Sequence, residues 1–281
     1  MIQGSHAIDI RRREGGATSG LEDQVAVEEP LEIRLGYATP EGRAHRAISI
    51  TMRTPGNDRE LAAGFLFTES IISHADDVLS IDHCGPPAPS TGYRNVVRVE
   101  LAAHVDVDLG RLERHFYTTS SCGVCGKTSL DALHANGLHA FGEDPGRFRE
   151  SVLLSIPAKL RDGQETFAQT GGLHAAGAFD ASGKLAVVME DVGRHNAVDK
   201  LVGHLLLNRE LPADDLGLMV SGRASFELLQ KALVARFPLL AAVSAPSSLA
   251  VSLAREFNMT LVGFLRDDTY NVYAGTGRLG L

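Results

Sequence analysis

Short apolar runs alternate with helical periodicity through the C-terminal half of this 281-residue chain. Runs of four or five apolar residues without polar interruption are typical of strands buried on both faces, and helices between such strands cover an α/β sheet. The expected strands are 185–189, 216–220, 239–243 and 260–264, and the expected helices are 194–208, 225–236 and 247–257. The pattern predicts an α/β layered sheet within a C-terminal α/β domain over residues 151–281.

The preceding residues predict a smaller α+β part over residues 25–120. Alternation at 31–35 and 47–52 is typical of strands, and a turn at 54–58 precedes a helix running to Ile72. Two further strands are expected at 78–81 and 93–101. Residues 1–24 are rich in Arg, Gly, Ser and Glu and show no period, which predicts a mobile N-terminal tail.

Composition argues against several classes of protein. The net charge is −8, and Arg11–Arg12–Arg13 is the one basic run, so a broad basic face for nucleic acid is not expected. No apolar stretch approaches the roughly 20 residues that span a bilayer, and the N-terminus lacks the apolar core of a signal peptide. Three cysteines do not form a disulfide framework. These features predict a cytoplasmic protein that binds neither nucleic acid nor membrane.

Residues 120–127, SSCGVCGK, hold two of the three cysteines. A thiolate is the reactive form of cysteine, and a nearby cation or helix N-terminus lowers the pKa of a thiol. Lys127 follows the pair directly, and a helical pattern begins near residue 129. Residues 121–150 are therefore expected to form a C-x-x-C loop and helix, with redox or sulfur-transfer chemistry at Cys122 and Cys125.

Three alternatives exist for the cysteine pair. Structural zinc needs about four ligands, and Cys84, His83, His115 or His174 would have to complete the set. Zinc deaminases carry H-x-E and P-C-x-x-C, whereas this chain has His174-Ala175-Ala176 and a serine before Cys122. A thioredoxin-like motif should follow a first βαβ strand, and here the pair lies in mid-chain.

Polar loops follow the expected strands and predict a ligand site, because ligands of open α/β sheets bind beyond the carboxyl ends of the strands. These loops are residues 170–174, 190–196, 221–225 and 244–248. Small residues let a ligand approach the backbone, and helix N-termini favour anions. Arg194 and Arg223 could contact phosphate, with His174, His195 and Ser247 lining the pocket. The alternative is that these serines and asparagines cap helices.

Several segments in a fixed order resemble the formate dehydrogenase accessory sulfurtransferase family, FdhD. The resemblance covers about residues 30–275. Its segments are 53–58, 60–66, 121–127, 170–176, 190–200, 221–227, 244–249 and 263–271.

The resemblance implies a sulfur carrier. Members of that family accept persulfide sulfur from a cysteine desulfurase and pass it to the molybdenum (or tungsten) bis-guanine-dinucleotide cofactor of formate dehydrogenase. It also implies a homodimer and a cytidine-deaminase-like fold with an added N-terminal part. Cys122 corresponds to the family's persulfide carrier and Cys125 to its partner, with Lys127 beside them.

The family's cofactor-binding stretch corresponds to Phe264, Leu265, Arg266, Asp267, Asp268 and Thr269. A guanine nucleotide such as GDP is expected to occupy the same site as the cofactor. The competing hypothesis is a chaperone that holds the molybdenum cofactor and whose cysteines are structural.

Overall fold

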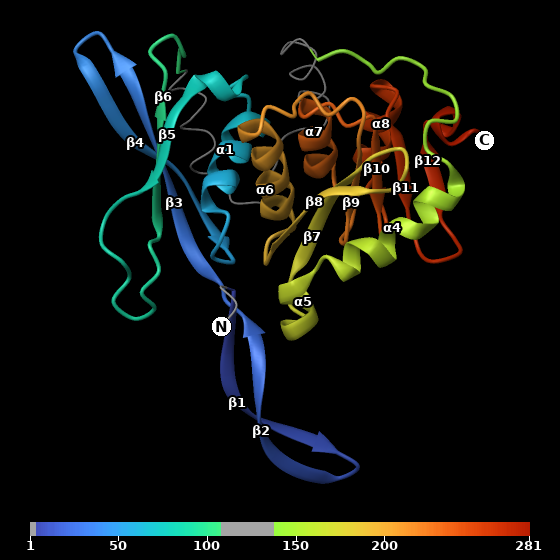
Figure 1. Cartoon of the computed structure of the whole chain (residues 1–281), viewed down its shortest axis with the longest axis horizontal. Coiled ribbons are helices and arrows are strands. Elements are labelled where there is room, and N and C mark those ends of the chain that lie inside the picture. Colours follow the sequence, from blue (N-terminus) through green and yellow to red (C-terminus); the bar gives the residue numbers. More distant parts are fainter. Residues whose placement is uncertain (1–3, 108–137) are drawn as a thin grey trace.

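The structure, a computed structural model, describes residues 4–107 and 138–281. Cys122, Cys125 and Lys127 lie outside these ranges. Two sheets flank a central layer of helices (Figure 1). A six-stranded sheet is built from the C-terminal residues and a four-stranded sheet from the N-terminal residues, so the mixed α/β class is confirmed. None of the described helices is both long and apolar enough to cross a membrane.

The six-stranded sheet has the strand order β12-β11-β10-β9-β7-β8. Strands β9, β10 and β11 are parallel, whereas β7 runs antiparallel to both β8 and β9, and β12 antiparallel to β11. The strands are β7 (His174–Phe179), β8 (Leu185–Asp191), β9 (Gly217–Val220), β10 (Leu239–Ala242), β11 (Thr260–Gly263) and β12 (Asn271–Ala274). The four strands expected from apolar runs are confirmed to within two residues.

The apolar run at 185–189 predicts a strand buried on both faces, and that part of the prediction is wrong. Strand β8 is an edge strand with Ala186 exposed and Val187 and Val188 only partly buried. An edge strand that carries apolar side chains cannot be told from a central strand by periodicity alone.

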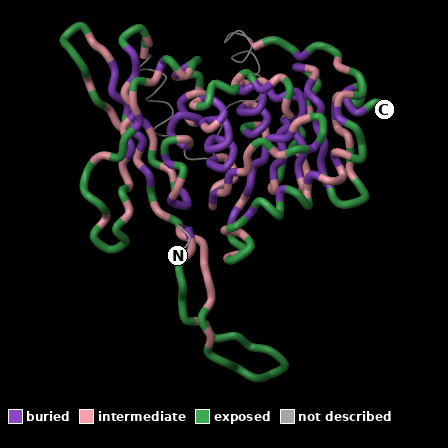
Figure 2. Tube along the Cα trace, viewed as in Figure 1, coloured by how far each residue is buried: buried purple, intermediate pink, exposed green. Residues whose placement is uncertain are grey.

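Helices cover both faces of this sheet. Helices α6 (Arg194–Leu207), α7 (Phe226–Val234) and α8 (Ser248–Glu256) pack on one face, and α4 (Glu150–Asp162) packs on the other. Successive strand residues point to opposite faces of the sheet. Leu218 packs in the core on the side of α6, α7 and α8, and Met219 packs in the core on the side of α4. Helix α5 (Glu165–Thr170) leads into β7, and a 3₁₀ turn, η2 (Thr276–Leu279), ends the chain. The central strands β9, β10 and β11 are buried along their whole length, and Figure 2 shows the buried residues concentrated in the interior of this part.

The four-stranded sheet has the order β4-β3-β6-β5 and packs one face on helix α1 (Asp58–Thr68). Its strands are β3 (Glu29–Thr39), β4 (Gly42–Arg53), β5 (Val78–His83) and β6 (Val96–Leu101), with a 3₁₀ turn, η1 (Ala75–Asp77), before β5. Leu31, Ile33 and Leu35 alternate inward from β3 and confirm the expected period of two.

Helices α1 and α6 join the two sheets by direct contact of their backbones. A Cβ atom at Gly64 would lie 1.8 Å from the carbonyl oxygen of Asp199, and one at Gly203 would lie 1.8 Å from that of Glu60. Only glycine fits at this crossing. Thr68, Asp199 and Lys231 close the same interface, since Lys231 Nζ donates to Asp199 Oδ1 at 2.8 Å and to Thr68 Oγ1 at 2.9 Å.

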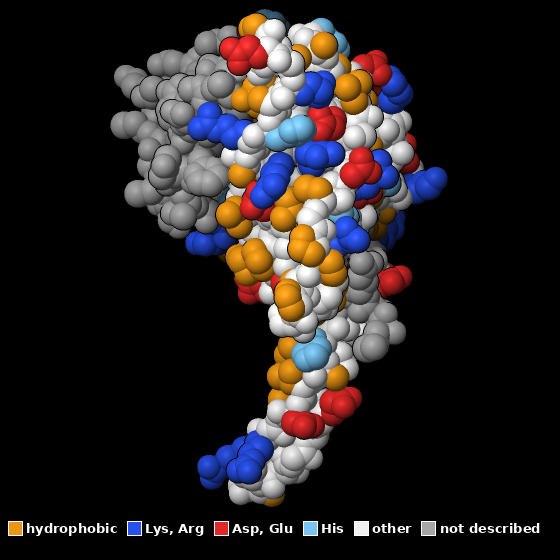
Figure 3. All heavy atoms as spheres, turned by 90° about the vertical axis from the view of Figure 1, so that its left-hand side faces the viewer, with side chains coloured by type: hydrophobic (Ala, Val, Ile, Leu, Met, Phe, Trp, Pro, Cys, Tyr) orange, Lys and Arg blue, Asp and Glu red, His pale blue; other side chains and the backbone are white. Residues whose placement is uncertain are grey.

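The expected tail over residues 1–24 is instead regular structure from Ser5 onward, so that prediction is wrong. Strands β1 (Ser5–Glu14) and β2 (Ala17–Ala26) form an antiparallel hairpin that projects from the body (Figure 1). Gly15 and Gly16 both have positive φ, as a two-residue type I′ turn requires. Most of its side chains are exposed on both faces, so no apolar alternation marked the strands. Basic side chains, Arg11 to Arg13, gather near its far end (Figure 3).

Candidate functional site

The polar loops meet at one edge of the six-stranded sheet. The carboxyl end of β8 and the amino end of β7 are adjacent because Asp191 pairs with His174, and Val220 at the end of β9 pairs with Ala176. The parallel strands β10 and β11 end on the same side as β9. Figure 1 shows this edge at the lower side of the sheet, beside α5. We call it the carboxyl edge.

Main-chain hydrogen bonds tie the loops of the carboxyl edge to one another. Ala224 N donates to Ala245 O at 3.2 Å, and Ser247 N donates back to Ala224 O at 3.0 Å. Phe264 N donates to Ser244 O at 3.3 Å. The Ser221 hydroxyl accepts from Ala175 N at 2.8 Å. Loops fixed in this way present a preformed surface to a ligand.

His174, Arg194 and Gly222 are neighbours at the centre of the carboxyl edge. A Cβ atom at Gly222 would lie 3.4 Å from His174 Nδ1 and 3.8 Å from Arg194 Cδ. Burial lowers the pKa of His174, the charge of Arg194 lowers it further, and the carboxylate of Asp191 opposes both. At neutral pH the pair therefore consists of a neutral imidazole beside a guanidinium.

His195 lies in the first turn of α6, close to the charges of α7. Burial, followed by the charges of Lys231 and Arg194, lowers the pKa of His195 to about 4. Its Nε2 atom and Arg194 Nε are buried without a hydrogen-bond partner. Buried polar atoms are normally paired, so two unpaired ones at the start of one helix mark a place where a ligand could supply the missing acceptor or donor.

Arg223 and Ser247 are exposed at the rim of the carboxyl edge. Ser247 is the N-cap of α8, and its hydroxyl accepts from Ala250 N at 3.2 Å. The capping alternative therefore describes Ser247 correctly. Arg223 lies in the loop after β9, where its side chain is free to reach a bound anion.

The stretch 264–269 continues from β11 along the same edge. Phe264 has φ of 53° and is 38% exposed, whereas Leu265 is fully buried in the core beneath the sheet. Arg266, Asp267, Asp268 and Thr269 are exposed, and Arg266 N closes a turn on Thr269 O at 2.9 Å. A ligand at this edge could meet the side chain of Phe264 but not that of Leu265.

Sequence reasoning missed Asp191 and Thr54. Asp191 is fully buried directly beneath the Arg194 turn, and the backbone N of Thr54 donates to its Oδ2 at 3.1 Å. The sequence does hold a signal for Asp191, which ends an apolar strand in the segment E-D-V-G-R-H-N. An acidic residue at that place is expected to be buried, and a buried carboxylate needs hydrogen-bond or ion-pair partners.

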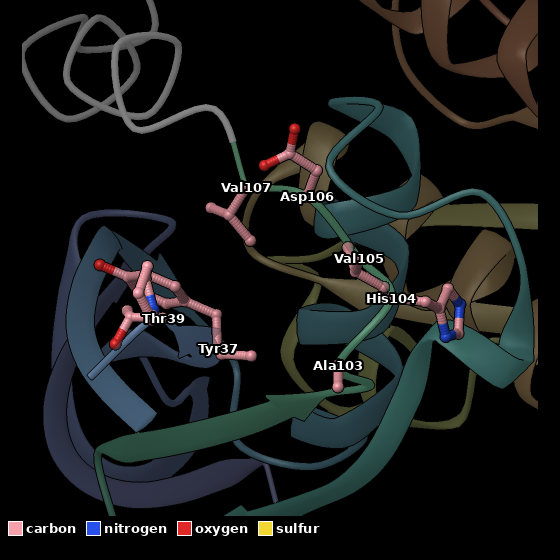
Figure 4. Close-up of a pocket in the computed structure, with 9 residues that line it drawn as sticks. Tyr37, Thr39, Ala103, His104, Val105, Asp106 and Val107 are labelled. Atoms are coloured by element: carbon pink, nitrogen blue, oxygen red, sulfur yellow. The ribbon is translucent and has the colours of Figure 1, made fainter. Parts of the chain in front are cut away.

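A separate cavity of about 330 Å³ lies far from the carboxyl edge, between β3 and the segment after β6. Tyr37, Thr39 and residues 103–107 line it (Figure 4). His104 points away from Tyr37, and its Nε2 atom donates to Asp77 Oδ1 at 3.0 Å. In residues 4–107 and 138–281, no cluster of three or more His, Cys, Asp or Glu could hold a metal ion. Cys122 and Cys125, the pair at the centre of the structural-zinc alternative, lie outside those ranges, whereas Cys84, His83 and His174 lie inside them.

Comparison with known proteins gives matches over nearly the whole chain. A model described as the FdhD/NarQ family matches residues 26–280. A sulfur carrier protein FdhD of Mycolicibacterium paratuberculosis is 50% identical over 282 residues, covering 97% of this chain and 99% of the relative. The protein of that name from Streptomyces coelicolor is 50% identical over 274 residues, covering 97% and 94%. The one from Sulfurisphaera tokodaii is 43% identical, covering 93% and 94%.

A solved structure shares the fold. The crystal structure of a candidate formate dehydrogenase accessory protein from Desulfotalea psychrophila superposes with a TM-score of 0.74 and 24% sequence identity. The match covers 98% of this chain and 99% of that one.

Proposed function

The chain belongs to the FdhD/NarQ family, and from that premise we propose that it is a sulfur carrier in the maturation of formate dehydrogenase. The observation that carries the proposal is 50% identity, over almost the whole length, to proteins named as sulfur carriers. The sequence adds the C-x-x-C of Cys122 and Cys125, which has the composition of a reactive thiol pair.

In the proposed reaction Cys122 carries the sulfur. Its thiolate attacks the terminal sulfur of a persulfide on a cysteine desulfurase, the S–S bond of that persulfide breaks, and the desulfurase thiolate leaves. Cys125 then attacks the Cys122 sulfur that bears the extra atom, forming a Cys122–Cys125 disulfide and releasing hydrosulfide. The cation of Lys127 favours both thiolates.

The proposed acceptor is the molybdenum bis-guanine-dinucleotide cofactor, bound as a substrate at the carboxyl edge. Arg194 and Arg223 provide positive charge for phosphate, and the unpaired Arg194 Nε and His195 Nε2 offer polar contacts. His174, Ser247 and the stretch 264–269 complete the surface. The proposed functional unit is a homodimer, as the family resemblance suggests, and sedimentation of the purified chain tests it.

Intact-protein mass spectrometry tests the sulfur carrier. Wild type and Cys122→Ala are incubated with a cysteine desulfurase and cysteine. We expect wild type to gain the mass of one sulfur atom, removable by reductant, and Cys122→Ala to gain none. Formate dehydrogenase activation should fail with Cys122→Ala. Retention of full activation by that variant would favour a cofactor chaperone instead.

GDP binding tests the nucleotide site independently of the cysteines. Arg194→Ala removes a guanidinium from the carboxyl edge, so we expect GDP affinity to fall by about 10- to 100-fold, the cost of one charge-assisted hydrogen bond. Arg34→Ala is the matched control, because Arg34 is an exposed arginine on β3 that pairs with Glu32. Equal titration curves for wild type and Arg194→Ala would remove Arg194 from the site.

A further inference from the structure

We propose that Asp191 is a positioning residue that fixes the Arg194–His195 turn at the carboxyl edge, and that residues 51–58 of the N-terminal part belong to the same site. This inference rests on the function proposed above, because it concerns the ligand site of that function. It follows from a buried hydrogen-bond network that joins the ends of β4 and β8.

The carboxylate of Asp191 is fully buried and accepts from four donors. Oδ1 accepts from Gly193 N at 2.8 Å and from Asn196 Nδ2 at 2.9 Å. Oδ2 accepts from Thr54 N at 3.1 Å and lies 2.8 Å from Lys200 Nζ. Gly193 and Asn196 flank Arg194 and His195 in the chain. One carboxylate therefore holds both ends of the turn that carries the two ligand-facing side chains.

The N–H, the hydroxyl and the carbonyl of Thr54 each form a hydrogen bond with the segment 190–200. Besides the N–H that binds Asp191, its hydroxyl oxygen accepts from Val192 N at 3.2 Å, and its carbonyl accepts from Lys200 Nζ at 2.9 Å. Lys200 is 2% exposed and also donates to Glu190 O at 3.1 Å. The ammonium is thereby matched by three acceptors, and no charge in the network is left unpaired.

Neighbouring residues of β4 extend the contact. Asn196 Nδ2 also donates to Met52 O at 2.7 Å, and Asn196 Oδ1 accepts from Thr51 Oγ1 at 3.1 Å. Arg53 forms two hydrogen bonds with Asp58, each 2.9 Å long, and His83 contacts the same carboxylate at 2.9 Å. The turn between β4 and α1 is thus fixed by hydrogen bonds to Asn196 before Thr54 and by the Arg53–Asp58 pair. These contacts hold the Thr54 backbone in position to bind Asp191.

The consequence is that the N-terminal part sets the orientation of Arg194 and His195. No side chain of residues 51–58 needs to touch a ligand for this effect. Loss of the Asp191 carboxylate removes the side-chain acceptor of Gly193 N and Thr54 N and one of the three acceptors of Lys200 Nζ, so the first turn of α6 loses its anchor.

Asp191→Asn and Thr54→Val test the inference, with Asp199→Asn as the matched control. Asp199 is also a buried carboxylate of α6, but its side-chain oxygens accept from Thr68 and Lys231 and not from residues 190–196. Hydrogen exchange is measured on peptides covering residues 190–198, and GDP affinity is measured on the same proteins. Thr54→Val removes a single hydroxyl and keeps the test available if Asp191→Asn does not fold.

We expect exchange at residues 190–198 to quicken at least tenfold in Asp191→Asn and Thr54→Val, relative to the rest of the chain, and GDP affinity to fall at least tenfold in Asp191→Asn. Asp199→Asn should change neither. Unchanged local exchange in both test variants, or an equal loss of affinity in Asp199→Asn, would overturn the inference. If wild type binds no GDP, the proposed nucleotide site is refuted, and the exchange result alone decides the positioning role.

Discussion

His195 lies in a largely buried site among charged side chains. Its imidazole is largely buried at the start of α6, and the groups that act on its pKa are Lys231, Arg194, Glu227 and Glu69. Two of these are cations and two are carboxylates. Burial and the two cations act in the same direction and outweigh the carboxylates, so the neutral imidazole is the stable form.

Stability should therefore depend on pH through His195. Its pKa is about 4 in the folded protein against an ordinary 6.5, so the unfolded chain takes up a proton first as pH falls. The free energy of unfolding should decrease from pH 6.5 toward pH 4 by up to about 3 kcal/mol, with no contribution above pH 7. Urea unfolding of wild type and His195→Gln over this range measures it. Equal pH slopes for the two proteins would contradict the assignment.

At the carboxyl edge, sequence reasoning could find the residues but not how they are held. Strand ends and loop composition were enough to bring Arg194 and Arg223 to one edge, because strands that run in the same direction end together. His174 reaches the same edge because β7 runs antiparallel to its neighbours and begins there. The same reasoning could not assign Asp191 a role, because its partner Thr54 lies 137 residues earlier in the chain. Nor could it separate Leu265, which is buried, from the exposed residues that follow it.

Among the elements, those with a strong period were predicted and those without one were missed. Helices α6, α7 and α8 begin and end within two residues of expectation. Helix α4 was not foreseen, since Pro157 lies inside it and proline removes a helical hydrogen bond. The strands β1 and β2 bury little on either face, so only their Gly15–Gly16 turn marked them.

The crossing of α1 and α6 should not tolerate any side chain. In Gly64→Ala the new Cβ would meet the Asp199 carbonyl at 1.8 Å, so the helices must separate. We expect a loss of about 3 kcal/mol or more in the free energy of unfolding, at or beyond the usual range for overpacking. Gly142→Ala is the control, because no atom lies within 4 Å of its added Cβ. Denaturant unfolding compares them, and similar midpoints would refute the backbone contact.

On the scale of the whole molecule, the β1–β2 hairpin should be separable from the fold. Among the described residues its two strands pair with each other and with no further strand, and α5 contacts both of them. Val27 N donates to Gly4 O at 2.8 Å, so the chain can be rejoined there. Replacing Ser5–Ala26 with two glycines should shift the Tm by no more than about 4 °C in calorimetry. Failure of that shortened chain to fold would show that the hairpin supports the body.

The two sheets, by contrast, should melt together. The two are connected by main-chain contact at Gly64 and Gly203 and by the buried Asp199–Lys231 pair beside it. If either sheet lost its helix, α1 or α6, the helix of the other sheet would lose its packing partner. Calorimetry should accordingly record a single cooperative transition whose van't Hoff and calorimetric enthalpies agree, so the four-stranded and six-stranded sheets behave as one thermodynamic unit.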